Sequence, residues 1–127
     1  MQDTINKLKF KGAGIVINAP ANLEKEFVKH GFKTTLNIKS LNSNILVFIN
    51  NKKEFLNFLR EQLKFIELDS VLWFAYPKGS SKIKTDINRD TIRVTAEEFC
   101  ITTVAAISID DTWSALRFRP ISKVGKK

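Results

Sequence analysis

The chain has 127 residues, of which 43% are hydrophobic and 27% charged, with a formal net charge of +8. This length fits one domain, 1–127, and the composition is that of a globular protein rather than a disordered one. The longest apolar run, Ile45 to Ile49, is too short to span a bilayer, and no secretory signal pattern opens the chain. We expect a cytoplasmic protein without a membrane partner.

The first half alternates between strand-like and helix-like segments. A polar lead-in (1–11) precedes a short strand at 14–18, a helix from about Pro20 to His30, a second strand at 32–38 and an apolar strand at 45–49. Pro20 suits the first turn of a helix, and Gly31 suits its end. The unbroken apolar run predicts a strand covered on both faces.

The second half continues this alternation. Asn51 and Glu54 resemble a capping box ahead of an amphipathic helix, which is followed by an apolar strand at 71–76 and a loop at 77–84. Thr85 or Asp86 is expected to cap a third helix that runs toward Phe99. Strands at 102–109 and 112–118 complete the chain before a frayed tail at 121–127.

Alternating helices and apolar strands predict the α/β class. We expect a small three-layer Rossmann-like domain: a mostly parallel sheet, helices on both faces, and an antiparallel C-terminal hairpin that closes one edge.

Cofactor and metal motifs are not found. Gly12 and Gly14 precede the first strand, whereas the glycines of a dinucleotide fingerprint follow it, and the sequence contains no P-loop. One His and one Cys do not make a metal site. We therefore predict neither cofactor nor metal, and we expect Cys100 to be a buried, small hydrophobe.

The loop after the apolar strand at 71–76 is the first candidate site. Lys78, Gly79, Ser80 and Lys82 follow Tyr76 and lead toward a helix, an arrangement that would hold an anion through backbone N–H groups and positive charge. A solvated surface turn accounts for the same residues. The lysines of the first half are scattered singly, whereas a nucleic-acid surface calls for a clustered basic patch.

The following helix offers two interpretations. Asp86, Asp90 and Arg93 are spaced for intrahelical pairing. Alternatively, Asp86 or Asp90 is a general base and Arg89 an anion clamp.

The last strand places an aromatic ring beside guanidinium groups. Strand alternation sets Trp113, Arg117 and Arg119 on one face, which would form a stacking and phosphate-binding surface. The alternative is an edge strand guarded by charge, with the arginines paired to acids such as Asp110.

Three blocks of the second half carry a family resemblance. Residues 73–79, the pattern Thr85-Asp86-x-x-Arg89-Asp90, and residues 110–120 resemble a bacterial family called domain of unknown function 3052. The resemblance is specific over 71–120 and implies no activity, cofactor or catalytic residue.

Three functional hypotheses remain open. The first is a binding or accessory module for an anionic ligand (a nucleotide, phosphorylated metabolite or nucleic acid). Its candidate residues are Tyr76, Lys78, Gly79, Ser80, Lys82, Arg89, Trp113 and Arg117. The second is a homodimeric interaction module that docks through the Trp113 strand. The third is an enzyme with Asp86 or Asp90 as base.

Overall fold

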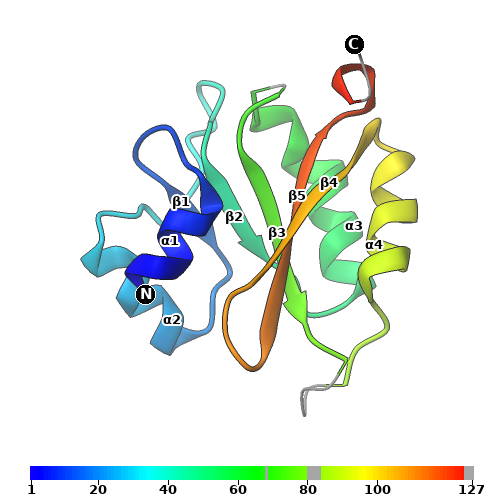
Figure 1. Ribbon diagram of the computed structural model, residues 1–127. Coiled ribbons are helices and arrows are strands. Elements are labelled where there is room, and N and C mark those ends of the chain that lie inside the picture. Colours follow the sequence, from blue (N-terminus) through cyan, green and yellow to red (C-terminus); the bar gives the residue numbers. More distant parts are fainter. Residues whose placement is uncertain (68, 80–83, 125–127) are drawn as a thin grey trace.

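The computed structural model describes residues 1–67, 69–79 and 84–124 (Figure 1). The α-helices are α1 (Gln2–Leu8), α2 (Ala21–Lys29), α3 (Lys52–Glu61) and α4 (Arg89–Glu97). The strands are β1 (Ile15–Ile17), β2 (Ile45–Phe48), β3 (Leu72–Pro77), β4 (Ile101–Ser108) and β5 (Trp113–Pro120), and two short 3₁₀ turns are η1 (Leu63–Phe65) and η2 (Ile121–Lys123).

The five strands form one mixed sheet in the order β1-β2-β3-β5-β4. The first three are parallel, and β5 is antiparallel to both β3 and β4. The predicted α/β class and the antiparallel C-terminal hairpin are confirmed. However, β5 lies inside the sheet and β4 forms the edge, so the Trp113 strand is not an edge strand.

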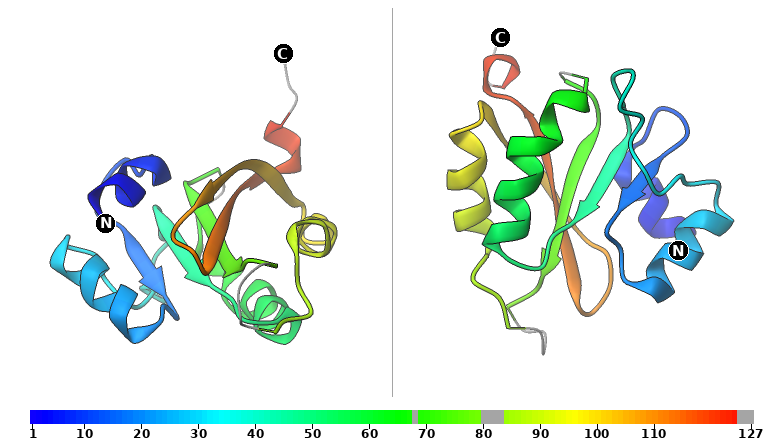
Figure 2. Two further views of the ribbon diagram at one scale, coloured as in Figure 1. Left: turned by 60° about the horizontal axis from the view of Figure 1, so that its bottom comes forward. Right: turned by 180° about the vertical axis from the view of Figure 1, so that it is seen from behind.

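Helices cover both faces of the sheet. Phe55 of α3 and Ile92 of α4 pack with Phe74 in one core cluster, and Phe27 of α2 packs with Phe48 and other residues in a second cluster on the opposite face. Seen from behind, α3 and α4 lie in front of the sheet (Figure 2). The apolar runs of β2 and β3 supply both clusters because successive side chains of a strand point to opposite faces.

Between β1 and β2 the chain lies first on the outer side of β1 and then crosses to its inner side. After α2, Lys33 pairs with the outer edge of β1: its carbonyl accepts from the N–H of Val16 at 2.8 Å, and its own N–H donates to the carbonyl of Gly14 at 3.0 Å. The chain then returns past β1 to form β2 on the other side. A Cβ on Gly14 would lie 2.5 Å from the ring of Phe32, so the packing of this ring against Gly14 requires glycine.

Two segments in the first half differ from expectation. The lead-in contains α1, which Trp73 holds by donating its indole N–H to the carbonyl of Leu8 at 2.9 Å. The predicted strand at 32–38 is wrong, because only Lys33 pairs with β1. The chain beyond it folds around the buried Asn42, whose Nδ2 donates to the carbonyls of Asn37 and Phe65, both at 2.8 Å. The side chain of Asn42 thus satisfies backbone carbonyls that would otherwise accept hydrogen bonds from a neighbouring strand.

Three expectations for the second half are also corrected. Asn88 caps α4, with its side chain accepting from the N–H groups of Asp90 and Thr91, so neither Thr85 nor Asp86 does so. Within the expected tail at 121–127, residues 121–123 form η2, while 125–127 lie outside the described residues. Cys100 is exposed rather than buried, in a left-handed conformation (φ 67°) just after α4.

None of the described helices has the length and apolar character needed to cross a membrane.

Candidate ligand-binding site

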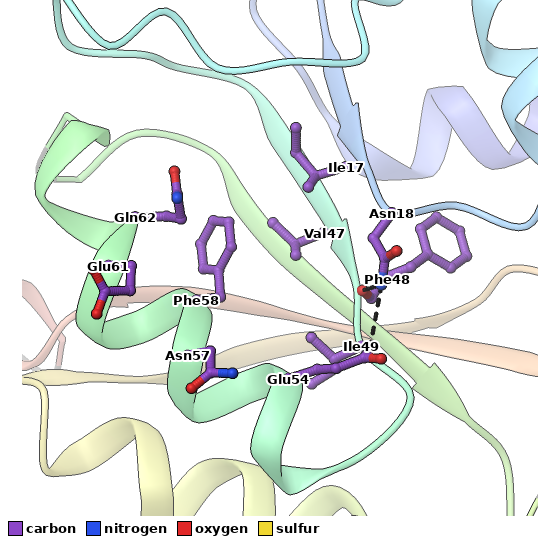
Figure 3. Close-up of a pocket in the computed structure, with 10 residues that line it drawn as sticks. All are labelled: Ile17, Asn18, Val47, Phe48, Ile49, Glu54, Asn57, Phe58, Glu61 and Gln62. Atoms are coloured by element: carbon purple, nitrogen blue, oxygen red, sulfur yellow. Dashed lines mark hydrogen bonds between the residues drawn. The ribbon is translucent and has the colours of Figure 1, made fainter.

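A pocket of about 300 Å³ opens where β1 and β2 end (Figure 3). The helix α3 forms one wall, and the ends of the two strands form the other. The lining residues are Ile17, Asn18, Val47, Phe48, Ile49, Glu54, Asn57, Phe58, Glu61 and Gln62. The pocket therefore lies at the carboxyl edge of the parallel strands β1 and β2.

Asn18 ties the ends of both strands to α3. It follows β1 in the left-handed conformation, with φ 61°, which asparagine tolerates better than most residues. Its Nδ2 donates to the carbonyl of Phe48 at 3.0 Å and to Oε1 of Glu54 at 3.2 Å (Figure 3, dashed). The amide is thereby held at the mouth of the pocket.

Several donors fix the carboxylate of Glu54. Its Oε1 also accepts from the backbone N–H of Asn50 at 2.9 Å and from Nδ2 of Asn50 at 3.0 Å. The backbone N–H of Glu54 donates to Oδ1 of Asn51 at 2.9 Å, so the predicted cap of α3 is confirmed. In a capping box the carboxylate of Glu54 would accept from the backbone N–H of Asn51. Here it accepts from the backbone N–H of Asn50 instead.

Helical spacing brings the remaining polar groups to the pocket. Glu54, Asn57, Phe58 and Glu61 stand at i, i+3, i+4 and i+7 along α3, and such residues share one face of a helix. Ile17, Val47 and Phe58 give the pocket an apolar floor. Its polar lining consists of two carboxylates and three amides. Of the described residues that line the pocket, none has a cationic side chain. These groups suit a ligand that carries N–H donors or positive charge, and they disfavour a phosphate.

A second polar group lies at the same edge of the sheet, beyond β3. Tyr76 faces Ser114 across β3 and β5, and Ser114 faces Ser108 across β5 and β4. Because directly opposed residues share one face of a sheet, the three hydroxyl groups form a row. Nζ of Lys78 donates to Oγ of Ser108 at 2.6 Å, which places an ammonium group at the end of this row.

Arg89 joins this group from the first turn of α4. Burial raises the pKa of the half-buried Tyr76 hydroxyl, whereas the guanidinium of Arg89 and the hydroxyl of Ser114 oppose that rise. The charge of Arg89 thus acts on the Tyr76 hydroxyl, while Lys78 reaches the same row of hydroxyl groups through Ser108.

Other predicted site residues lie elsewhere. Trp113 is a core residue, 4% exposed, and packs edge-to-face on Phe48 with ring centroids 5.0 Å apart. Arg117 is opposite Trp73 in register, on the face of the sheet away from Tyr76. Its buried Nε has no hydrogen-bond partner among the described residues. Gly79 is exposed, while Ser80 and Lys82 lie outside the described residues.

The two acidic candidates lie at the surface, ahead of and within the first turn of α4. Asp86 and Asp90 are both exposed, and α4 begins only at Arg89, so the spacing argument that joined Asp86 to Asp90 and Arg93 does not apply. Arg93 instead lies 3.5 Å from Glu97.

The acid that pairs with the last strand also differs from expectation. Arg119 pairs with Asp69 at 2.7 Å. Asp110 instead closes the β4–β5 turn by accepting from the N–H groups of Thr112 and Trp113, both at 2.8 Å.

No family model matches this chain. No curated protein matches it either. The resemblance to domain of unknown function 3052 therefore stays a prediction, and the functional argument rests on the geometry of the described residues. Within that part of the chain, no three His, Cys, Asp or Glu side chains gather where they could hold a metal ion.

Four pocket residues are not predicted as such from the sequence: Asn18, Glu54, Asn57 and Glu61. An asparagine directly after a buried strand was one available signal, since it marks a chain turn at the carboxyl edge. The polar residues at helical spacing were another, but such a stripe is typical of any solvent-facing helix. Only the position of α3 against β1 distinguishes the two cases.

Proposed function

We propose that the chain is a small Rossmann-like module that binds a small molecule in the pocket between β1, β2 and α3. The supporting observation is that the pocket lies at the carboxyl ends of the parallel strands β1 and β2, which the chain joins by way of a single bridge residue at the outer side of β1. In open α/β sheets, ligands bind outside the carboxyl ends of the parallel strands.

The lining groups indicate the ligand class. Glu54 and Glu61 are acceptors, while Asn18, Asn57 and Gln62 both donate and accept. Ile17, Val47 and Phe58 offer apolar contact to a flat body. A volume of about 300 Å³ is at the small end of ligand pockets and too small for a dinucleotide. We infer a neutral or cationic ligand with one ring system and N–H donors, such as a nucleobase or an aromatic amine.

Amide chemical shifts would test this proposal. Nucleobases, nucleosides and aromatic amines would be titrated into the labelled chain, beside carboxylates of matched size. A binder should shift the side-chain amides of Asn18, Asn57 and Gln62. Glu61→Gln should weaken that binding by about tenfold, because a charge-assisted hydrogen bond is lost.

The exposed Glu98, at the C-terminal cap of α4, offers a matched control. Glu98→Gln removes the same charge outside the pocket and should leave the affinity unchanged. The proposal fails if no base or amine shifts the pocket amides, or if both substitutions weaken binding equally.

A second candidate is the binding of an anionic ligand at the edge of Tyr76, Lys78 and Arg89. The hydroxyl row that ends at Lys78 favours it, together with the charge of Arg89 that acts on Tyr76, because hydroxyl donors beside cations suit a phosphate group. Trp113 and Arg117 are not part of this version of the site. A nucleotide, a phosphorylated metabolite or a nucleic-acid phosphate would present the same chemistry.

Binding of inorganic polyphosphate at low salt would test the second candidate. Lys78→Gln and Arg89→Gln should each weaken binding and reduce its salt dependence. Lys25→Gln, on the exposed side of α2, removes the same charge elsewhere. If all three variants lose affinity alike, the binding reflects net charge and this candidate is wrong.

We also propose a cytoplasmic location, since the single cysteine allows no internal disulfide.

A further inference from the structure

A second hollow, the side groove, adjoins the ligand pocket. It also measures about 300 Å³ and lies between α3, the end of β1 and the loop at 34–38. Ile17, Phe58 and Gln62 line both hollows. In the close-up of the pocket, Ile17 and Gln62 lie in the upper part and Glu54 in the lower part (Figure 3). The carboxylate of Glu54 therefore stands at one end of the pocket, and the side groove adjoins the other end.

The lining that belongs to the side groove alone is uncharged. Leu36 and Ile38 contribute apolar side chains, and Thr34 and Thr35 contribute hydroxyl groups. None of the described residues that line the groove is charged. Leu36 is half-buried and packs against the core cluster that contains Phe58, whereas Ile38 is 70% exposed. The groove thus offers apolar contact and no partner for a charged group.

Hydrogen bonds fix the backbone that carries Leu36 and Ile38. Between them, the N–H of Asn37 donates to Oδ1 of Asn42 at 3.0 Å, and its carbonyl accepts from Nδ2 of Asn42 at 2.8 Å. The N–H of Lys39 donates to Oδ1 of Asn37 at 2.9 Å. The groove is therefore formed before a ligand arrives, and a ligand does not have to order this loop.

We propose that the ligand of the pocket is amphipathic. Its head, with N–H donors or positive charge, lies at Glu54, and an apolar extension runs past Phe58 into the side groove. This inference rests on the proposed function and adds an extension to the ligand inferred there. The lining orients the ligand, because Glu54 and Glu61 line only the pocket, whereas Leu36 and Ile38 line only the groove. A charged extension would lose water in the groove without gaining a partner.

Two series of ligands would test the inference: para-alkylbenzylamines and N-alkyladenines, each with a tail that grows from methyl to butyl. The head and the ring stay constant within a series. In the series that binds, the dissociation constant should fall about threefold with each added methylene group. Every member should shift the side-chain amides of Asn18 and Asn57. The longer members should also shift the methyl signals of Leu36 and Ile38.

A substitution in the groove tests where the tail lies. Ile38→Ser should remove most of the gain in affinity per methylene group, because it takes away an apolar contact of the tail. Val28→Ser is the matched control, since Val28 is 49% exposed on α2 and lines neither hollow. It should leave the gain unchanged.

The outcomes separate this inference from the proposed function. If the pocket amides shift but the affinity ignores the length of the tail, the extension into the groove is wrong and the pocket remains. Equal effects of Ile38→Ser and Val28→Ser would also overturn the extension, because the tail would then lie elsewhere. If neither series shifts the amides of Asn18 and Asn57, the proposed function fails and this inference fails with it.

Discussion

The carboxylate of Asp86 accepts a hydrogen bond from the backbone N–H of Lys52 at 2.8 Å. Lys52 opens α3, and the first N–H groups of a helix have no partner within it. Asn51 satisfies the N–H of Glu54 from within the same segment, whereas Asp86 reaches Lys52 from the loop before α4. Thr85 adds a second link, since its hydroxyl donates to the carbonyl of Asn50 at 2.6 Å. These two hydrogen bonds hold the loop against the beginning of α3. This structural role accounts for Asp86 without a catalytic one.

Removal of the Asp86 cap should destabilise the fold. Asp86→Ala leaves the N–H of Lys52 without its acceptor, and a lost helix cap costs about 1 kcal/mol. Urea denaturation would measure this loss. Asp111→Ala, at an exposed position of the β4–β5 turn, is the matched control and should change the free energy of unfolding far less. Equal losses for the two variants would contradict the capping role.

Asn42 should be among the most sensitive polar positions. It is 6% exposed, and Asn42→Leu removes its bonds to Asn37 and Phe65. The part-buried carbonyls of Asn37 and Phe65 would lose their side-chain donor, and the backbone N–H of Asn37 its acceptor, so we expect a loss of about 3 kcal/mol in the free energy of unfolding. Asn22→Leu, on the exposed side of α2, serves as the comparison in the same denaturation experiment. A loss no larger than that of the control would show that the loop is held by other contacts.

The pair between Asp69 and Arg119 should make stability depend on acid pH. The hydrogen bond from Arg119 is the main cause that lowers the pKa of Asp69 below its usual 3.8 in the folded protein. A carboxyl with a lowered folded pKa contributes stability above its unfolded pKa and loses it as pH falls through the folded pKa. Arg119→Gln should therefore be less stable than wild type near neutral pH, and the two should converge well below 3.8.

Denaturation curves across acid pH would measure this convergence. Arg60→Gln, at an exposed position of α3, removes the same charge away from Asp69. A constant gap between Arg119→Gln and wild type at all pH values would attribute the loss to packing rather than to the carboxylate.

Tyr76 is the single tyrosine of the chain, so tyrosinate absorbance reports on it alone. Burial raises its pKa above 10.0, and Arg89 counteracts part of that rise. Arg89→Gln should therefore raise the pKa of Tyr76 further. Because the folded pKa exceeds the unfolded value, burial of the neutral phenol contributes stability below 10.0 that is lost as pH rises above it. Arg93→Gln, on the same helix, should leave the titration unchanged; an equal shift for both would remove Arg89 from the Tyr76 group.

Local patterns in the sequence predicted much of the secondary structure. The apolar runs at 45–49 and 71–76 became β2 and β3 because each supplies side chains to both faces of the sheet. Asn51 capped its helix because the acceptor and the donor lie three residues apart. The segment at 32–38 failed because β-favouring residues form a strand only where a neighbour pairs with them, and just Lys33 meets β1.

The candidate sites depended more on tertiary structure. The loop cluster of Tyr76 and Lys78 was predicted because those residues are adjacent in sequence. Arg117 was assigned to the same cluster, but strand register sets it on the opposite face from Tyr76. No local property of the last strand reveals which face of β3 it will meet.

The sequence by itself determined the α/β class, the buried strands and the cap of α3, because these arise from side-chain periodicity and from hydrogen bonds within a few residues. Tertiary structure alone decided that Asn18 reaches Glu54, that Asp86 caps a distant helix, and that β4 forms the edge of the sheet. These relationships follow from strand order, which depends on how the whole chain can cover the apolar faces of its sheet at once.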